Sequence, residues 1–192
     1  MKLGLKLILF SSVLMILFNS VGCNQPGPHA ALEDAASNAE QEKVPESKWQ
    51  EKSNNPELVQ PQPEGTLRLT AQNGKAIGPD IKYMPEWDAF GWFTAKDRVE
   101  WEVDVKESGK YAVQLEWSVS DKEAGKEFLL EANDQKLTGI VRPSGSWEIF
   151  KIADIGSIYL EAGVQHIVFK SNKHFDEGAI LDLRELKLTF VK

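Results

Sequence analysis

Two neighbouring stretches of strict alternation, at residues 99–105 and 111–119, constrain the fold of this chain more than any other feature. In each stretch, large apolar side chains occupy every second position and polar or small ones fill the positions between them. Successive side chains of a strand point to opposite faces, so each stretch places one face in a core and the other in water. A short connection containing Ser-Gly separates the stretches and favours an antiparallel hairpin. Trp101 and Trp117 fall on the apolar faces, and we expect both in the core.

A lone hairpin is unstable in water, so other strands must cover its apolar face. From Thr66 onward the chain provides ten to eleven short strands and no convincing helix. The strands on either side of residues 133–135 are predicted to form a second hairpin. Residues 148–153 and 157–160 are predicted to form two separate strands. A change in the phase of the apolar residues at Arg184-Glu185 predicts a β-bulge. The predicted fold is all-β, an antiparallel β-sandwich of the jelly-roll kind at residues 66–192.

The N-terminus has the pattern of an export signal. Lys2 and Lys6 precede an uncharged apolar run at residues 7–18, and small residues follow it. The apolar run is too short to span a bilayer comfortably, which argues against a retained transmembrane helix. We therefore expect residues 1–22 to be a signal peptide that is removed.

Cys23, the only cysteine, lies at the expected cleavage point. The sequence Ser-Val-Gly-Cys that ends there resembles the lipobox of bacterial lipoproteins, in which the cysteine carries lipid, including palmitate, and becomes the mature N-terminus. Each buried methylene of such a chain contributes roughly 0.8 kcal/mol, so two or more chains anchor a protein stably. Asn24 is not an inner-membrane retention signal of the Asp type. The resemblance thus implies a protein of the bacterial cell envelope that is anchored through its N-terminal lipid, with the outer membrane or cell surface favoured. The alternative is that residues 1–22 are an ordinary signal peptide and that the cysteine after them is accidental.

Residues 23–65 are predicted to form a disordered tether. They are rich in Pro, Glu, Gln, Ser and Asn and contain few large apolar residues, so they bury too little apolar surface to offset their ordering entropy. Without residues 1–22 the chain has 20 basic and 29 acidic side chains, a net charge of about −9. No basic patch stands out, and we expect no nucleic-acid partner.

Several blocks of residues 66–192, in order, resemble the galactose-binding-like jelly roll of carbohydrate-binding module families 6 and 35. They are FGWFTAKDRVEWEVDV at residues 90–105, SGKYAVQLEW at 108–117, and PSGSWEIFKIADIGSIYLEAGVQHIVF at 143–169. GPDIKYM and ILDLRELKL also look like the modules attached to bacterial sulfatases and glycosidases of polysaccharide degradation. The resemblance implies a non-catalytic module whose partner is a polysaccharide or other glycan.

The same resemblance points to the residues that would contact a sugar. In family 6, sugars stack on aromatic side chains of the loops at one edge of the sandwich, and Trp92 and Trp147 match two such positions. An indole suits the apolar face of a pyranose ring, while nearby amides and carboxylates read its hydroxyls. Trp87, His174 and Phe175 lie in polar loops and are further candidates, because packing explains loop aromatics less readily. For Trp92 and Trp147, packing within the sandwich is the competing interpretation.

The sequence departs from the family pattern at two places. Ile180 stands where family 6 has a sugar-binding Asn. Thr70 and Gln72 replace two Glu that ligate a structural calcium, and Ca²⁺ prefers several oxygen ligands that include carboxylates. Asp182 alone remains as a carboxylate ligand, so structural calcium is possible but disfavoured, and no metal site is predicted.

The chain is not predicted to be an enzyme. Its three histidines, His29, His166 and His174, have no metal-ligand spacing, and neither a P-loop nor a dinucleotide-binding glycine motif is present. Acidic side chains at residues 100–104 recur about 7 Å apart along one strand face, a spacing within reach of paired glycosidase carboxylates. A solvated strand face explains them better, since no aromatic cleft surrounds them in sequence.

Two functions of different classes follow. The leading hypothesis is a lipid-anchored, exported protein that displays a non-catalytic carbohydrate-binding module. The alternative is a structural or protein-interaction module of the cell envelope with the same fold and no sugar site, and Ile180 favours it. A weaker third is an accessory subunit of a surface complex that degrades polysaccharides.

Overall fold

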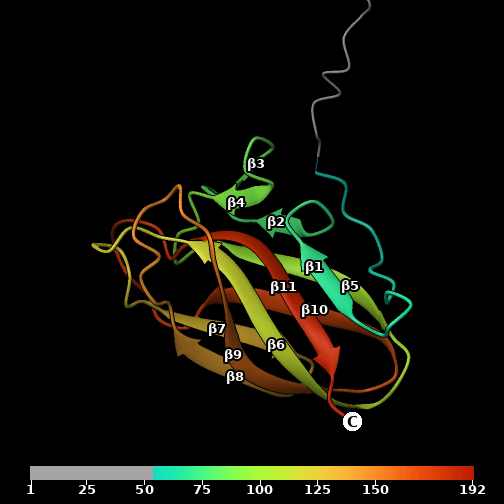
Figure 1. Ribbon diagram of the computed structural model, residues 1–192. Helices are drawn as coiled ribbons and strands as arrows, with labels where there is room; N and C mark the ends of the chain where they lie inside the picture. The colour runs from blue at the N-terminus through green and yellow to red at the C-terminus, as the bar shows by residue number, and fades with distance from the viewer. Residues whose placement is uncertain (1–53) are drawn as a thin grey trace, which may run out of the picture. The chain divides into compact units, whose positions relative to one another are not determined.

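The computed structural model describes residues 54–192. The predicted signal peptide, the lipidation of Cys23 and the tether up to residue 53 lie outside the described residues. Residues 54–192 form eleven strands in two antiparallel sheets and no helix, which confirms the all-β sandwich (Figure 1). Within this range no helix is long and apolar enough to cross a membrane.

The first sheet has six strands. Their order is β3 (Lys82–Met84), β4 (Ala89–Gly91), β11 (Asp182–Phe190), β6 (Gly109–Ser118) and β9 (Lys151–Leu160), with β1 (Leu67–Thr70) also pairing with β11. The second sheet has five strands, in the order β2 (Lys75–Ile77), β5 (Arg98–Val105), β10 (Gly163–Ser171), β7 (Glu127–Ala132) and β8 (Gln135–Ile140). Every strand pair is antiparallel, as in a jelly roll.

The predicted hairpin of β5 and β6 is wrong in its pairing. β5 pairs with β2 and β10 in one sheet, whereas β6 pairs with β9 and β11 in the other. The connection between them crosses from sheet to sheet, and the two apolar faces meet across the core instead of lying side by side. Alternation reports which face of a strand is buried, but it carries no information about the neighbouring strand.

Of the other local predictions, the second hairpin and the bulge are confirmed, and the two separate strands at residues 148–160 are wrong. β7 and β8 form the expected hairpin, with Asn133 in the left-handed conformation (φ 50°) that its tight turn requires. A register shift between Leu183 and Glu185 confirms the predicted bulge. Residues 148–160, however, do not form two strands: β9 is continuous, and its pairing with β6 shifts register next to Gly156 (φ 130°).

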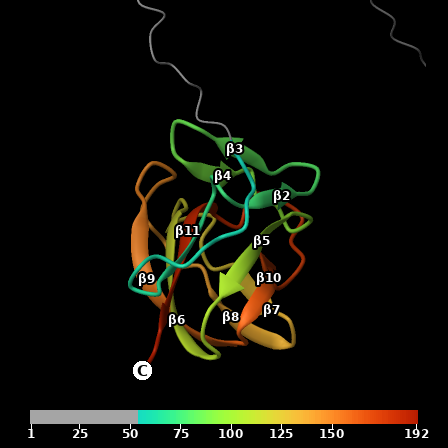
Figure 2. The same ribbon diagram turned by 90° about the vertical axis from the view of Figure 1, so that its right-hand side faces the viewer.

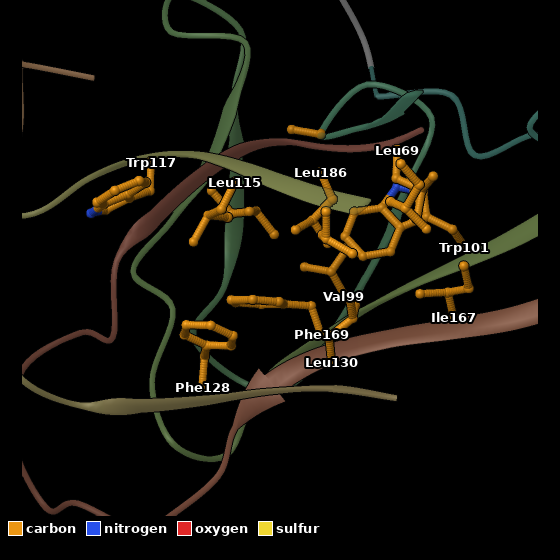
Figure 3. Close-up of a cluster of buried hydrophobic side chains, with 14 of the residues drawn as sticks. Leu69, Val99, Trp101, Leu115, Trp117, Phe128, Leu130, Ile167, Phe169 and Leu186 are labelled. Carbon is orange, nitrogen blue, oxygen red and sulfur yellow. The ribbon is translucent and has the colours of Figure 1, made fainter. Parts of the chain in front are cut away.

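The core lies between the two sheets and is dense with aromatic side chains (Figure 3). Trp101 and Trp117 are 1% and 3% exposed, which confirms their prediction as core residues. Phe169 is central to the core: its ring stacks on Phe128 at 5.6 Å and meets Phe93 edge-on at 6.0 Å. Each buried indole N–H is satisfied by a main-chain carbonyl, so these polar atoms add little cost to burial.

Residues 54–65, which we call the strap, belong to the folded unit and not to a disordered tether. Val59 is 4% exposed and pairs with β5: its N–H donates to the Glu102 carbonyl at 2.8 Å, and its carbonyl accepts from the Asp104 N–H at 2.9 Å. Figure 2 shows the strap running along the side of the sandwich. The sequence-based boundary at Thr66 lies too far along the chain, because one buried valine among prolines and glutamines leaves no periodic signal.

Candidate functional site

A cleft of about 680 Å³ lies where the solvent-facing side of the six-stranded sheet meets the strap. We call it the sheet-face cleft. Its floor comes from β1, β6 and β11, whose outward-pointing side chains alternate with core residues and include several charged ones. The charged side chains that line it from the sheet and its adjoining loop are Arg68, Asp88, Glu116, Arg184 and Glu185.

Two arginine–carboxylate pairs organise the floor of the cleft. Arg68 donates to Glu185 through both Nε, at 2.6 Å, and Nη2, and Glu185 is only 7% exposed. Its hydrogen bonds and negative charge raise the pKa of Arg68 above its ordinary value. Arg184 donates from Nη1 to Glu116 Oε1 at 2.7 Å. The paired groups hold one another in fixed orientations, so the floor presents ordered donors and acceptors to solvent.

An aromatic pair lies against Arg184, one of the residues that line the cleft. Trp87 stacks on Phe150 with ring centroids 6.2 Å apart and planes 28° from parallel. The guanidinium carbon of Arg184 lies 3.5 Å from the centre of the Phe150 ring, and its Nε donates to the Trp87 carbonyl at 3.0 Å. Trp87 is 37% exposed, so part of its indole remains open to a ligand. None of the predicted site residues lines the cleft itself, but Trp87 is connected to it, because its carbonyl accepts from the lining residue Arg184 and its neighbour Asp88 also lines the cleft.

Trp92 lies apart, on the loop that follows β4. It is 56% exposed, and its φ of 53° is rare for a bulky residue. Phe93 beside it is fully buried, and Asp97 fixes the loop by accepting from the Thr94 N–H at 2.7 Å. The Lys82 ammonium lies 5.4 Å from the indole centre. The loop therefore presents the ring to solvent, in a backbone conformation that the surrounding structure must hold.

The remaining predicted residues are divided between packing and solvent. Trp147 and Phe175 are half-buried and pack against the core. The ammonium of Lys126 lies 4.8 Å from the Phe175 ring centre. His174 is exposed, and its Nε2 lies 3.0 Å from Asp176 Oδ1. Trp147 and Phe175 are thus partly covered, whereas His174 is open to solvent next to Asp176.

Asp182 is a partly buried carboxyl at the start of β11. It lies between Gly91 of β4 and Ser118 of β6. Burial raises its pKa to about 7, against which a hydrogen bond with Ser118 acts only weakly. The Ser118 hydroxyl itself donates to the Trp147 carbonyl at 2.7 Å. The Asp182 environment therefore favours the neutral acid at pH values below about 7.

The acidic row of β5 forms a solvated, ion-paired face. Glu100 accepts from Arg98 Nε at 2.6 Å and lies 3.3 Å from His166 Nε2. Burial alone would raise the pKa of Glu100, but these hydrogen bonds hold it below its ordinary value. Asp104 pairs with Lys106. This row presents bound carboxylates on a sheet surface, not a proton donor and acceptor facing each other across a cleft.

Metal ligands do not gather anywhere within residues 54–192: no three His, Cys, Asp or Glu side chains there could hold an ion together. Thr70 lies at one of the family calcium positions, but here it forms hydrogen bonds with Asn73. Its Oγ1 accepts from the Asn73 N–H at 3.2 Å, and its N–H donates to Asn73 Oδ1 at 2.8 Å. Ile180, at the family Asn position, is fully buried and faces the core.

Sequence reasoning missed Phe150 and the paired charges of the cleft floor. Arg184 and Glu116 are 68 residues apart and meet only because β11 pairs with β6. The one available signal was the charged outward phase of these strands, which a solvated sheet face explains equally well.

Neither a protein-family model nor a curated protein matches the sequence. Solved structures do match by shape. A family 35 carbohydrate-binding module from Clostridium thermocellum is 14% identical with a TM-score of 0.52, the match covering 66% of this chain and 98% of that one. The C-terminal family 6 module of a marine laminarinase from Zobellia galactanivorans is 14% identical with a TM-score of 0.54, covering 65% and 98%.

Two further matches carry sugars. A carbohydrate-binding module of a Cellvibrio mixtus lichenase, in complex with cellotriose, is 15% identical with a TM-score of 0.53, covering 65% of this chain and 97% of that one. An exo-β-1,3-galactanase from Phanerochaete chrysosporium, with β-1,3-galactotriose, is 18% identical with a TM-score of 0.53, but the match spans only 29% of the galactanase. The folded part of this chain therefore has the jelly-roll fold of family 6 and family 35 carbohydrate-binding modules.

Proposed function

We propose that this protein is a non-catalytic carbohydrate-binding module that binds a neutral glycan in the sheet-face cleft. The observation that carries the proposal is the exposed Trp87, stacked on Phe150 and joined through Arg184 to a cleft lined by charged and amide side chains. An aromatic surface next to convergent polar groups is what a sugar ring with one apolar face requires.

The charge of the cleft favours a neutral ligand. Its lining contains four carboxylates, including Glu57 of the strap, and two guanidinium groups, a formal charge of −2. Both arginines are already paired with carboxylates, which weakens their attraction for sulfate or uronate groups. Carboxylates accept hydrogen bonds from hydroxyls, and side-chain amides both accept and donate them.

Trp92 is proposed as a second aromatic contact, at the loop edge and independent of the cleft. Its exposure and the left-handed backbone that presents it support this role. Trp147, His174 and Phe175 are proposed as lesser ligand contacts, since Trp147 and Phe175 pack against the core and His174 lies next to Asp176.

The proposed setting is the bacterial cell envelope, with the module held to the outer membrane or cell surface by lipid on Cys23. The lipobox resemblance and the Pro- and Gln-rich segment after it support this proposal. Incorporation of an alkyne-tagged fatty acid into the full chain, and its loss in Cys23→Ala, tests it. A chain that is exported and cleaved without lipid would contradict it.

A glycan array probed with the full chain in detergent tests the binding function. We expect saturable binding to neutral glycans that is lost in Trp87→Ala. The control is Tyr159→Ala, which removes an exposed aromatic side chain of β9 without changing the core and should retain binding. Parallel use of Trp92→Ala shows whether the loop edge contributes. Selective binding to sulfated or uronic glycans would contradict the assignment to the acidic cleft.

The alternative function, a structural or protein-interaction module of the envelope, is favoured by Ile180. This residue occupies the family's sugar-reading position and is fully buried in the core. A full chain that binds no glycan on the array, with folded wild-type protein confirmed by circular dichroism, would support this alternative.

A further inference from the structure

The strap is bound to the sandwich at both ends. Asn54 Nδ2 lies 2.7, 3.0 and 2.8 Å from the main-chain carbonyls of Ala71, Gln72 and Gly74. Val59, buried, pairs with β5, and Gln62 closes a turn by accepting from the Gly65 N–H at 2.8 Å. A segment held in this way has a defined position and can present side chains to a ligand without paying a large ordering cost.

Side chains of the strap form one wall of the sheet-face cleft. Because Val59 points into the core, its neighbours Leu58 and Gln60 point outward, and both line the cleft together with Gln62. Within the described part of the chain, the side-chain amides of Gln60 and Gln62 have no hydrogen-bond partner, and both residues are exposed. The cleft floor, by contrast, consists of paired charges.

We propose that Gln60 and Gln62 bind sugar hydroxyls in the sheet-face cleft, and that Asn54 and Val59 are positioning residues that hold this wall in place. The inference rests on the proposed glycan-binding function and assigns part of its specificity to the strap. A side-chain amide offers two N–H donors and a carbonyl acceptor, which matches the mixed donor and acceptor character of a hydroxyl pair. The free amides, not the paired arginines, would then distinguish one neutral sugar from another.

The experiment is isothermal titration calorimetry of the full chain in detergent with cellotriose, laminaritriose and β-1,3-galactotriose. The test variant is the double substitution Gln60→Ala and Gln62→Ala. Its matched control is Gln135→Ala, an exposed glutamine on β8 of the other sheet. Losing two hydrogen bonds is expected to weaken the best of the three sugars about tenfold, or to change which of them binds best, while the control leaves affinity unchanged.

Asn54→Ala separates positioning from contact. We expect the Val59 amide to exchange its hydrogen at least about tenfold faster, with β6 amides unchanged, and the affinity to fall as in the double variant. Wild-type protein that binds neither these three sugars nor any neutral glycan of the array overturns both the proposed function and this inference. Binding that Trp87→Ala abolishes and the glutamine variant leaves intact overturns this inference alone.

Discussion

The partly buried carboxyl of Asp182 makes a prediction about stability and pH. Its folded-state pKa is about 7, raised by burial from 3.8. Because the pKa is raised, the folded protein binds this proton more tightly than the unfolded chain does. Stability attributable to Asp182 is therefore complete at about pH 4, falls as the pH rises towards 7, and is lowest above 7. Asp182→Asn, which cannot ionise, should remove this decline.

The magnitude follows from the shift. A shift of one pKa unit corresponds to about 1.4 kcal/mol, so the full shift would amount to about 4 kcal/mol. Asp182 retains contact with solvent, which screens the carboxylate, so we expect the decline to be about 2–4 kcal/mol between pH 4 and pH 8.5. The amide of Asn is close in shape to a protonated carboxyl, so wild type and variant should be equally stable at pH 4.

Urea unfolding of the full chain at pH 4, 6 and 8.5, followed by tryptophan fluorescence, measures this difference. The control is Asp121→Asn, in the exposed loop after β6, which should shift stability by less than about 0.5 kcal/mol at every pH. The reasoning is refuted if Asp182→Asn gains nothing over wild type at pH 8.5, or if it gains the same amount at pH 4.

Three further substitutions test the packing, each by urea unfolding. A Cβ at Gly74 would lie 2.5 Å from Trp101 Nε1, so Gly74→Ala should cost about 1–3 kcal/mol; an unchanged midpoint would contradict the tight packing. Trp117→Phe places a smaller ring in a buried site and leaves the Arg142 carbonyl without its donor, so it should cost about 1–3 kcal/mol, whereas the same change at exposed Trp92 should cost under about 0.5 kcal/mol; equal costs would contradict the burial pattern. Arg184→Lys loses the guanidinium stacking and two hydrogen bonds and should cost about 1 kcal/mol with a red shift in tryptophan emission; unchanged emission would refute its contact with the aromatic pair.

The sequence predicts which face of a strand is buried better than it predicts which strands pair with one another. Alternation placed Trp101 and Trp117 in the core correctly, because a strand's side-chain period depends only on its own backbone. The same pattern wrongly paired β5 with β6, because a short polar connection suits a hairpin and a crossing between sheets alike. The bulge near Glu185 was readable because it shifts the apolar phase within a single strand.

The candidate site was predictable only in part. Trp87 stood out because a polar loop does not explain an aromatic side chain. Phe150 and Arg184 join it through the pairing of β9, β6 and β11, which no local pattern specifies. The exposure of Trp92 depends on its positive φ, a property of the loop and not of the residue type.

The strap was missed for a related reason. Its fixation depends on Asn54 reaching three carbonyls and on Val59 inserting alone into the core. A prediction of disorder from proline- and glutamine-rich composition describes the segment as a whole and does not detect such single anchoring residues. A soluble fragment that begins at Thr66 would lack this segment, so binding studies need the chain from residue 54 or earlier.

The central claim is that a neutral glycan binds at the sheet-face cleft beside Trp87. The most direct measurement is the nuclear magnetic resonance spectrum of the tryptophan indole N–H groups, recorded while the glycan that binds best on the array is added. We predict that the Trp87 signal shifts in a saturable way and that the signals of buried Trp101 and Trp117 do not move. Saturable binding that shifts only Trp92, or no indole signal at all, would contradict the claim.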